Sequence, residues 1–153
     1  MKTKDPSFQA LLQLGDQLRV LTSQHRGEMA GERETPASAS VQAQSELGAL
    51  LENVRQHNPW FTEESSLYAL RYWADALSED VLEQWLSAYA APANHPRIVA
   101  LIMAGNIPLV GFHDLISVLL TGHNALVKSA TKDTLLLKYM VDLLTGFNPE
   151  LIS

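Results

Sequence analysis

Hydrophobic residues recur at helical spacing through the first half of the chain. In residues 7–22, despite Gly15, several apolar side chains lie near one face of a helix, namely Phe8, Leu11, Leu12, Leu18 and Leu21. A second helix carries Leu47, Leu50, Leu51 and Val54. It should end before Asn58-Pro59, because the residue before a proline disfavours helical backbone. Residues 26–44 lose the periodicity and are rich in Gly, Pro, Ala and Ser, which predicts a flexible linker.

Two hydroxyl residues followed by acidic pairs predict further helix N-termini. Thr62 precedes two glutamates and Ser78 precedes Glu-Asp, so each hydroxyl can cap a helix whose positive end attracts the carboxylates. The apolar stripes that follow are Leu67, Leu70, Ala74 and Leu77 for the first helix, and Val81, Leu82, Trp85, Leu86 and Tyr89 for the second. We therefore expect residues 45–95 to be helical, with the aromatic residues Trp60, Phe61, Trp73 and Trp85 in the core.

The pattern changes after residue 96. Residues 97–103 (RIVALIM) are a continuous apolar run, typical of a strand buried on both faces of a parallel sheet. Pro108 suits the first turn of a buried helix over residues 108–121, which Gly122 would end. Residues 124–128 (NALVK) form a second short strand, and Thr131 can cap a last helix. That helix should turn Leu135, Leu136, Tyr139, Met140 and Leu143 inward and stop at Gly146.

These elements predict an α/β fold class. An N-terminal helix (1–25), the linker (26–44) and a helical region (45–95) precede a βαβα unit over residues 96–153. The chain of 153 residues is long enough for one domain. Its hydrophobic stretch at 98–120 is interrupted by Asn106, Pro108, His113 and Asp114, which argues against a membrane span. With no secretory signal at the N-terminus, we expect a cytoplasmic protein.

Composition excludes several classes of function. The net charge of −6 argues against nucleic-acid binding, which needs a basic face. The chain has no cysteine, so it can form neither a disulfide nor a thiolate zinc site, and it lacks a cysteine nucleophile. The five histidines are dispersed without the spacing of a helical metal site. His113 beside Asp114 is a weak candidate for a general base, because adjacent helical residues point apart.

The candidate chemistry lies where the two predicted strands end. Ligands of open parallel sheets gather beyond the carboxyl ends of the strands, and residues 104–107 and 128–131 should be neighbours there. Asn106 offers an amide, Lys128 a cation, and Ser129 and Thr131 hydroxyls, a set that suits phosphates, ribose hydroxyls or an oxyanion. The alternative is structural, with Asn106 as a helix N-cap and Lys128 simply solvated. The glycine order G-x-G-x-x-G of dinucleotide-binding loops is absent.

Several motifs resemble one enzyme family. NPWFT at 58–62, LSAY at 86–89, MAGNIPLVGFHD at 103–114 and GHNALVKSATKD at 122–133 are similar to LuxC-type acyl-CoA reductases of the aldehyde dehydrogenase superfamily. The resemblance covers residues 58 to the end of the chain. It implies that residues 96–153 are half of an aldehyde-dehydrogenase-like Rossmann domain.

The resemblance also implies roles for the residues at the strand ends. Asn106 would donate to the oxyanion, and Lys128 would hold the adenosine ribose. The remaining cofactor-binding residues would be Met103, Ala104, Gly105, Ser129 and Thr131. Thr131 stands where relatives that prefer NAD often carry a glutamate, and a hydroxyl tolerates a 2′-phosphate. We therefore expect NADPH as the cofactor, with NADH possible.

The missing cysteine limits what this chain does alone. The resembling enzymes take the acyl group onto a cysteine in their C-terminal half, so we expect an N-terminal portion that is inactive by itself. In the complete enzyme its partners would be acyl-CoA and NADPH. The open sheet edge would pair with a C-terminal half or with a second copy. The alternative is a non-enzymatic helical interaction module or a degenerate paralogue.

Overall fold

The structure is a computed structural model that describes residues 5–30, 38–89 and 95–151. Its elements are α1 (Pro6–Ala30), α2 (Ser38–His57), α3 (Glu63–Ala76), α4 (Glu79–Ser87), β1 (Ile98–Ile102), α5 (Phe112–Leu120), β2 (Asn124–Lys128), the short helical turn η2 (Thr131–Asp133), α6 (Thr134–Phe147) and a second such turn, η3 (Pro149–Leu151). The two strands pair in parallel, with Ile98 opposite Asn124 and Ile102 opposite Lys128. An α/β fold with a β-α-β-α order is thereby confirmed.

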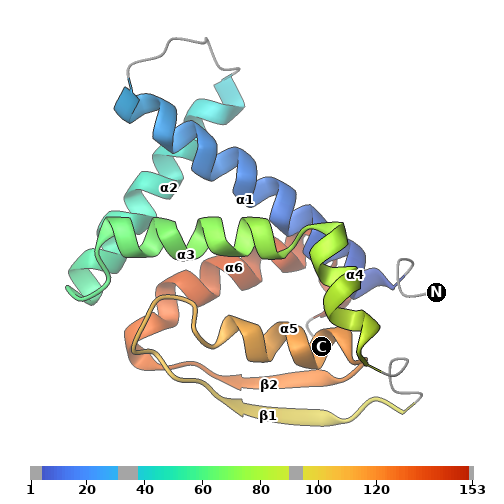
Figure 1. Ribbon diagram of the computed structural model, residues 1–153. Helices are drawn as coiled ribbons and strands as arrows, with labels where there is room; N and C mark the ends of the chain where they lie inside the picture. The colour runs from blue at the N-terminus through green and yellow to red at the C-terminus, as the bar shows by residue number, and fades with distance from the viewer. Residues whose placement is uncertain (1–4, 31–37, 90–94, 152–153) are drawn as a thin grey trace.

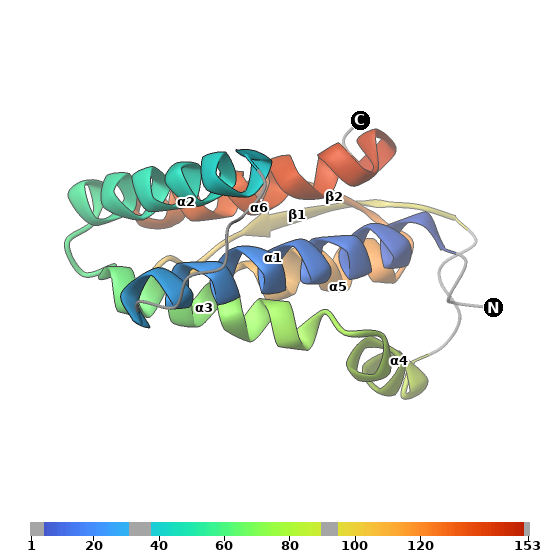
Figure 2. The same cartoon turned by 90° about the horizontal axis from the view of Figure 1, so that it is seen from above.

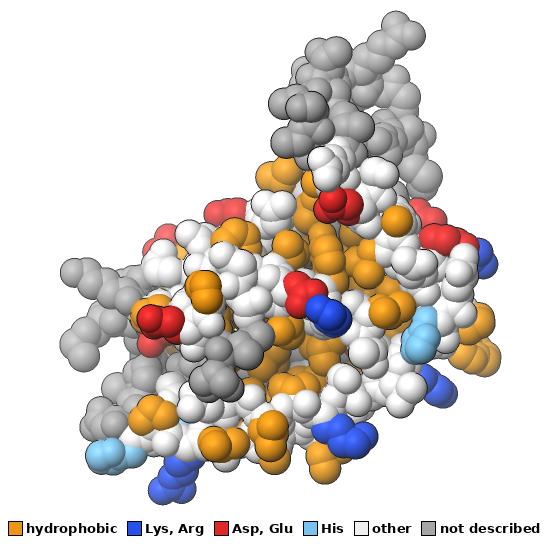
Figure 3. All heavy atoms as spheres, turned by 180° about the vertical axis from the view of Figure 1, so that it is seen from behind, with side chains coloured by type: hydrophobic (Ala, Val, Ile, Leu, Met, Phe, Trp, Pro, Cys, Tyr) orange, Lys and Arg blue, Asp and Glu red, His pale blue; other side chains and the backbone are white. Residues whose placement is uncertain are grey.

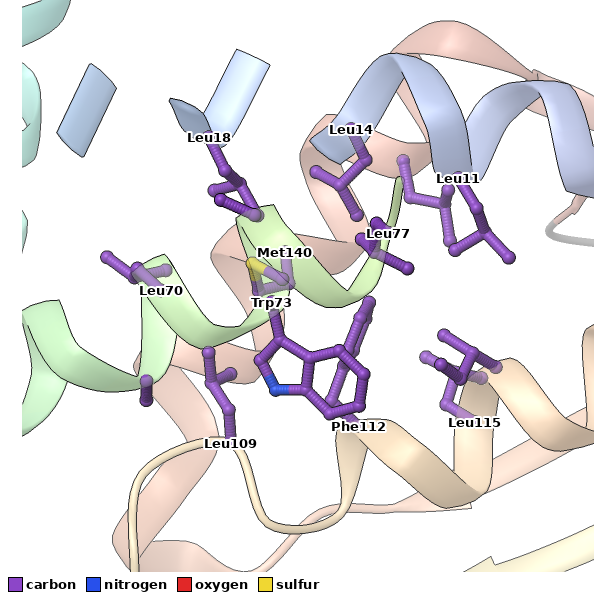
Figure 4. Packing of buried hydrophobic residues seen from close by; sticks show 14 of the residues in the cluster. Leu11, Leu14, Leu18, Leu70, Trp73, Leu77, Leu109, Phe112, Leu115 and Met140 are labelled. Atoms are coloured by element: carbon purple, nitrogen blue, oxygen red, sulfur yellow. The ribbon is translucent and has the colours of Figure 1, made fainter. Parts of the chain in front are cut away.

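All described helices lie on one side of the two-stranded sheet (Figure 1). α5 packs on both strands. α1 packs against α3 and α6, and in Figure 2 it runs between them, above α5. The N-terminal helices and the βαβα unit share one hydrophobic core. It includes Leu14 and Leu18 of α1, Leu77 after α3, and Phe112 and Leu115 of α5 (Figure 4). The first three helices therefore pack against the βαβα unit in one domain.

The structure confirms the predicted ends of α2 and α5 and the predicted starts of α3 and α4. α2 ends at His57, directly before Asn58-Pro59. The Thr62 hydroxyl caps α3 by accepting a hydrogen bond from the Ser65 N–H at 3.1 Å. Ser78 occupies the N-cap position of α4 but makes no capping hydrogen bond with its side chain. Gly122, after α5, has φ of +79°, a conformation that glycine adopts without steric cost.

The predicted linker is too long. α1 continues to Ala30 and α2 begins at Ser38, so both ends of the 26–44 segment are helical, and residues 31–37 lie outside the described residues. Alanine and glutamine have good helix propensity, and such a segment can extend a helix without an apolar stripe.

Trp60 is not in the core, as the sequence predicted it to be, since 84% of it is exposed. Its neighbour Phe61, only 1% exposed, fills the core at this turn.

The two helices of the βαβα unit begin later than expected. α5 starts at Phe112, and Pro108 lies in a turn where Leu109 has φ of +58°. The N–H of Leu109 is bonded to a carboxylate, and this bond holds the backbone out of the helix. Thr131 does not cap α6, because η2 intervenes and α6 begins at Thr134. The inward set of α6 is shifted accordingly, with Leu136, Leu137, Met140 and Leu144 buried.

The strands are not buried on both faces as predicted. Ile98, Ile102 and Leu126 are 73%, 85% and 64% exposed on the face away from the helices. Hydrophobic side chains accordingly appear along the lower edge of the molecule in Figure 3, where Figure 1 places the sheet. No described element covers this face. Within the described ranges, every helix is too short or too polar to cross a membrane.

Candidate functional site

The loops that follow the two strands lie against each other, as the sequence predicted. The N–H of Met103, directly after β1, donates to the carbonyl of Lys128 at 3.1 Å. Gly105 lies so close to Ala130 that an added Cβ would stand 2.4 Å from the Cβ of Ala130. The glycine is therefore required where the first loop crosses the second.

The two polar side chains singled out in the sequence are exposed at this edge of the sheet. Asn106 and Lys128 are both exposed, and neither side chain makes a hydrogen bond to another described residue. Asn106 is not a helix N-cap, because α5 begins six residues later, at Phe112. The N-cap alternative for Asn106 is therefore wrong, and the exposed position of Lys128 agrees with the solvated alternative for that residue.

The remaining predicted residues differ in their access to solvent. Ala104 and Thr131 are exposed, Gly105 and Ser129 are half-buried, and Met103 is only 6% exposed. The Met103 side chain packs beneath Gly111, so only its backbone can face a ligand. In the described part of the chain, the backbone N–H groups of residues 104–107 donate no hydrogen bond. They can serve an anionic or hydroxyl-bearing ligand at the strand ends.

An apolar groove borders the loop that carries Asn106. It has a volume of about 710 Å³ and lies between α3 and residues 107–110. α3 contributes Tyr68, Ala69, Tyr72 and Trp73 to its lining. Tyr68 and Tyr72 are 72% and 56% exposed, which is unusual for large aromatic side chains on a helix of the core. The sequence predicted the loop but not this groove.

The wall of the groove is held by aromatic packing. The rings of Trp73 and Phe112 meet edge to face with centroids 5.0 Å apart, and Leu109 lies beside them (Figure 4). His113 also lines the groove, with its ring 5.7 Å from that of Trp85. Its Nδ1 is 3.7 Å from the Asp114 carboxylate, too far for a hydrogen bond, and both side chains are exposed. The arrangement of an oriented general base is therefore absent at His113.

A buried carboxylate that sequence reasoning missed connects the two loops. Asp133 is 4% exposed, and its Oδ2 accepts a hydrogen bond from the Leu109 N–H at 2.7 Å. Burial raises the pKa of Asp133 to about 6, although the hydrogen bond from Leu109 opposes the rise. The available signal was an aspartate at the start of an otherwise apolar helix.

The end of α2 anchors the second loop from the other side. The side-chain amide of Asn58 donates to the carbonyl of Lys132 at 3.3 Å, and Nε2 of His57 lies 2.9 Å from the carbonyl oxygen of Thr131. Asn58 is 5% exposed, so this contact is inside the fold. The sequence marked Asn58 as the end of a helix and as the start of the motif NPWFT, but not as a contact of η2, because its partner lies 74 residues away.

The described residues contain no group of His, Asp and Glu side chains that could hold a metal ion. The candidate site thus comprises the exposed Asn106 and Lys128 at the strand ends and an apolar groove that begins at Ile107. Asp133 bonds the Leu109 N–H in the wall of this groove. Comparison of the chain with protein-family models, curated protein sequences and solved structures gave no match.

Proposed function

We propose that this chain is the N-terminal portion of an NADPH-dependent acyl-CoA reductase, which converts an acyl-CoA or another acyl thioester into a fatty aldehyde. The observation that carries the proposal is the apolar groove, because it begins at the residues that directly follow Asn106. A hydrocarbon chain and a reactive carbonyl group could be bound there together. The motif resemblance at residues 103–114 and 122–133 supports the same assignment.

The groove suits an acyl chain. Its lining is mostly apolar, and each methylene group removed from water contributes about 0.8 kcal/mol. The thioester carbonyl would lie near the loop, where the Asn106 side-chain amide can donate to the oxygen as negative charge develops on it. Loop N–H groups of residues 104–107, which donate no hydrogen bond to described residues, can add to this stabilisation.

The strand ends fit a dinucleotide on three counts. Lys128 is exposed, and the backbone N–H groups of residues 104–107 donate no hydrogen bond to described residues. Because Gly105 has no side chain and packs closely on Ala130, a ligand can approach the backbone at this point. Lys128 would bind the ribose of NADPH, and Thr131 would tolerate a 2′-phosphate. When bound, the cofactor supplies the hydride. Lys128 and Thr131 would orient the cofactor, and the acyl group would lie next to Asn106.

The covalent step has to come from outside this chain, which has no cysteine. A thiolate on another segment would attack the thioester carbonyl, and the coenzyme A thiolate would leave with the electron pair of the broken C–S bond. The chain by itself is expected to be inactive. Pairing along β1 with a C-terminal half or a second copy, and the alternative of an interaction module, stay predictions.

Binding of dodecanoyl-CoA to the 153-residue chain tests the proposal. Calorimetric titration should show saturable binding that coenzyme A alone does not reproduce, because the groove recognises the hydrocarbon. Tyr68→Ala and Tyr72→Ala should each weaken binding at least threefold. Tyr89→Ala is the matched control, because Tyr89 is 54% exposed, close to the 56% of Tyr72, and does not line the groove. Equal affinity in all three variants, or equal binding of coenzyme A alone, would refute the groove as the acyl site.

A further inference from the structure

Asp133 is a buried carboxylate at the junction of the two strand-end loops. It ends η2 and precedes α6, and 4% of the residue is exposed. Its Oδ2 accepts the 2.7 Å hydrogen bond from the Leu109 N–H, whereas its buried Oδ1 accepts none from the described residues. No step of the proposed reaction uses this group, although burying a carboxylate is costly.

The partner of Asp133 has an unusual backbone. Leu109, with φ of +58°, is the only described residue other than glycine with a positive φ. A leucine rarely adopts this conformation, and it persists only where the surroundings hold it. Its side chain, 1% exposed, is fixed beside Trp73 and Phe112, and its N–H is fixed by Asp133 (Figure 4). Both the side chain and the backbone N–H of this strained residue are therefore held in place.

The short helical turn η2, which carries Asp133, is itself held in place. The Asp133 N–H donates to the Ala130 carbonyl at 3.1 Å, which closes the turn of η2. Asn58 bonds the neighbouring Lys132 carbonyl, so α2 holds η2 from the far side. Gly105 packs against Ala130, and an added Cβ at Gly105 would stand 3.5 Å from the Cβ of Asp133. A displacement of Asp133 would therefore move the loop on both sides of Asn106.

We propose that Asp133 is a positioning residue, whose carboxylate holds the backbone of Leu109 and thereby sets the wall of the groove and the loop that carries Asn106. The link to acyl binding rests on the proposed function of the groove. The hold on Leu109 is independent of it.

This hold changes with pH between about 5 and 7. Burial is the main cause of the raised pKa of Asp133, about 6, so the carboxyl is mostly ionised at neutral pH and mostly protonated at pH 5. Lys132, next to it in η2, is exposed, and His57 of α2 bonds to Thr131. Residues 104–111 carry no titratable side chain, and the nearest charged group along α6, Lys138, is paired with Asp142. Protonation of Asp133 weakens a charge-assisted hydrogen bond to Leu109.

An NMR titration of the unmodified chain tests the hold without any substitution. The amide proton of Leu109 and the side-chain carboxyl carbon of Asp133 should shift together between pH 4.5 and 7.5, with a common midpoint near pH 6. In Asp133→Asn the step at Leu109 should vanish, whereas in Asp142→Asn, an exposed carboxylate on α6, it should persist. A Leu109 amide without a pH step, or one that titrates equally in Asp133→Asn, would overturn the proposal.

Dodecanoyl-CoA binding at pH 7.5 tests the consequence for the groove. Asp133→Ala, which removes the acceptor, should weaken binding at least fivefold, whereas Asp133→Asn, which keeps an acceptor oxygen, should stay within twofold. Equal weakening in both variants would show that the acceptor is not what positions the groove. If the unmodified chain binds no acyl thioester, the proposed function fails, and the Leu109 titration still decides the role of Asp133.

Discussion

Gly15 of α1 faces Leu77, the residue that ends α3, at a distance that no larger residue could keep. A Cβ added to Gly15 would stand 2.7 Å from the Leu77 carbonyl oxygen and 2.9 Å from the Leu77 Cβ. The glycine therefore lets α1 approach the end of α3, and Leu77 itself is fully buried there. In the sequence, Gly15 looked like a weak point in a helix, but it is a packing requirement.

Gly15→Ala should lower the free energy of unfolding by about 1–3 kcal/mol, because the contact is with backbone, which cannot move away cheaply. Gly48→Ala is the matched control. Gly48 lies within α2 with nothing within 4 Å of an added Cβ, so this change should stabilise the chain by roughly 0.5–1 kcal/mol. Urea unfolding of the two variants measures both effects. Stabilisation by Gly15→Ala would mean that α1 does not lie this close to α3.

The sequence predicted the positions of helices and strands better than it predicted which of their faces are buried. Helical spacing identified α3 to within about two residues and the end of α2 at His57, because each has one apolar stripe facing the core. It missed the start of α2, which lies at Ser38 inside the predicted linker. The run RIVALIM identified β1, but such a run is equally apolar whether or not its second face is covered, so the exposure of Ile102 was not predictable. The turn at Leu109 was missed since its conformation depends on a carboxylate 24 residues later.

The candidate site was predictable only where it is local. Asn106 follows β1 and Lys128 ends β2, both of which the pattern identified, and parallel pairing brings such strand ends together. The groove needs the further knowledge that α3 packs beside residues 107–110, which no local pattern contains. Tyr68 and Tyr72, one turn apart, lie outside the apolar stripe of α3, so helical spacing agrees with their exposure but does not show what they line.

Lys128→Ala should weaken NADPH binding to the chain roughly tenfold, because it removes the exposed ammonium at the end of β2 that would bind the ribose. Chemical-shift titration with NADPH suits the weak affinity expected of half a cleft. Lys138→Ala is the control, since Lys138 is exposed on α6 and pairs with Asp142. The same loss in both lysine variants would indicate a general charge effect and no ribose site.

Asn106→Ala should act on the chemical step. In an enzyme completed by a segment that supplies the cysteine, loss of one oxyanion donor should lower turnover about a hundredfold. NADPH affinity should change less than twofold, because the amide faces the acyl group in the proposed arrangement. Single-turnover assays at saturating NADPH separate the two quantities. A variant with normal turnover would remove Asn106 from the oxyanion role.

The stability of the chain should depend on pH through Asp133. Its pKa is about 6 in the fold against 3.8 for an ordinary aspartate, so between these values the folded chain holds a proton that the unfolded chain has lost. This contribution is complete below about pH 4 and is lost as the pH rises through 6, amounting to at most about 3 kcal/mol. Urea unfolding at pH 4.5 and 7.5 should therefore show a smaller loss of stability in Asp133→Asn than in the unmodified chain. An unchanged pH dependence would contradict the raised pKa.

The same substitution at two isoleucines compares the open face of the sheet with the hydrophobic core. Ile102 of β1 is 85% exposed, whereas Ile116 of α5 is 3% exposed in the core. Ile116→Ala should lower the free energy of unfolding by about 2–5 kcal/mol, since it leaves a cavity in the core. Ile102→Ala should cost about 0.5 kcal/mol or less, because little of this side chain leaves water on folding.

The comparison also bears on the pairing predicted along β1. If a second copy pairs along the open edge of β1, the stability of the unmodified chain should rise with protein concentration. If a second copy instead covers the open face, Ile102→Ala should in addition cost as much as a core substitution. Unfolding at two protein concentrations a hundredfold apart, with sedimentation velocity to measure mass, distinguishes these cases. A small effect of Ile102→Ala together with a concentration-independent stability would show that the chain folds as a monomer with this face in water. Pairing with itself would then be excluded.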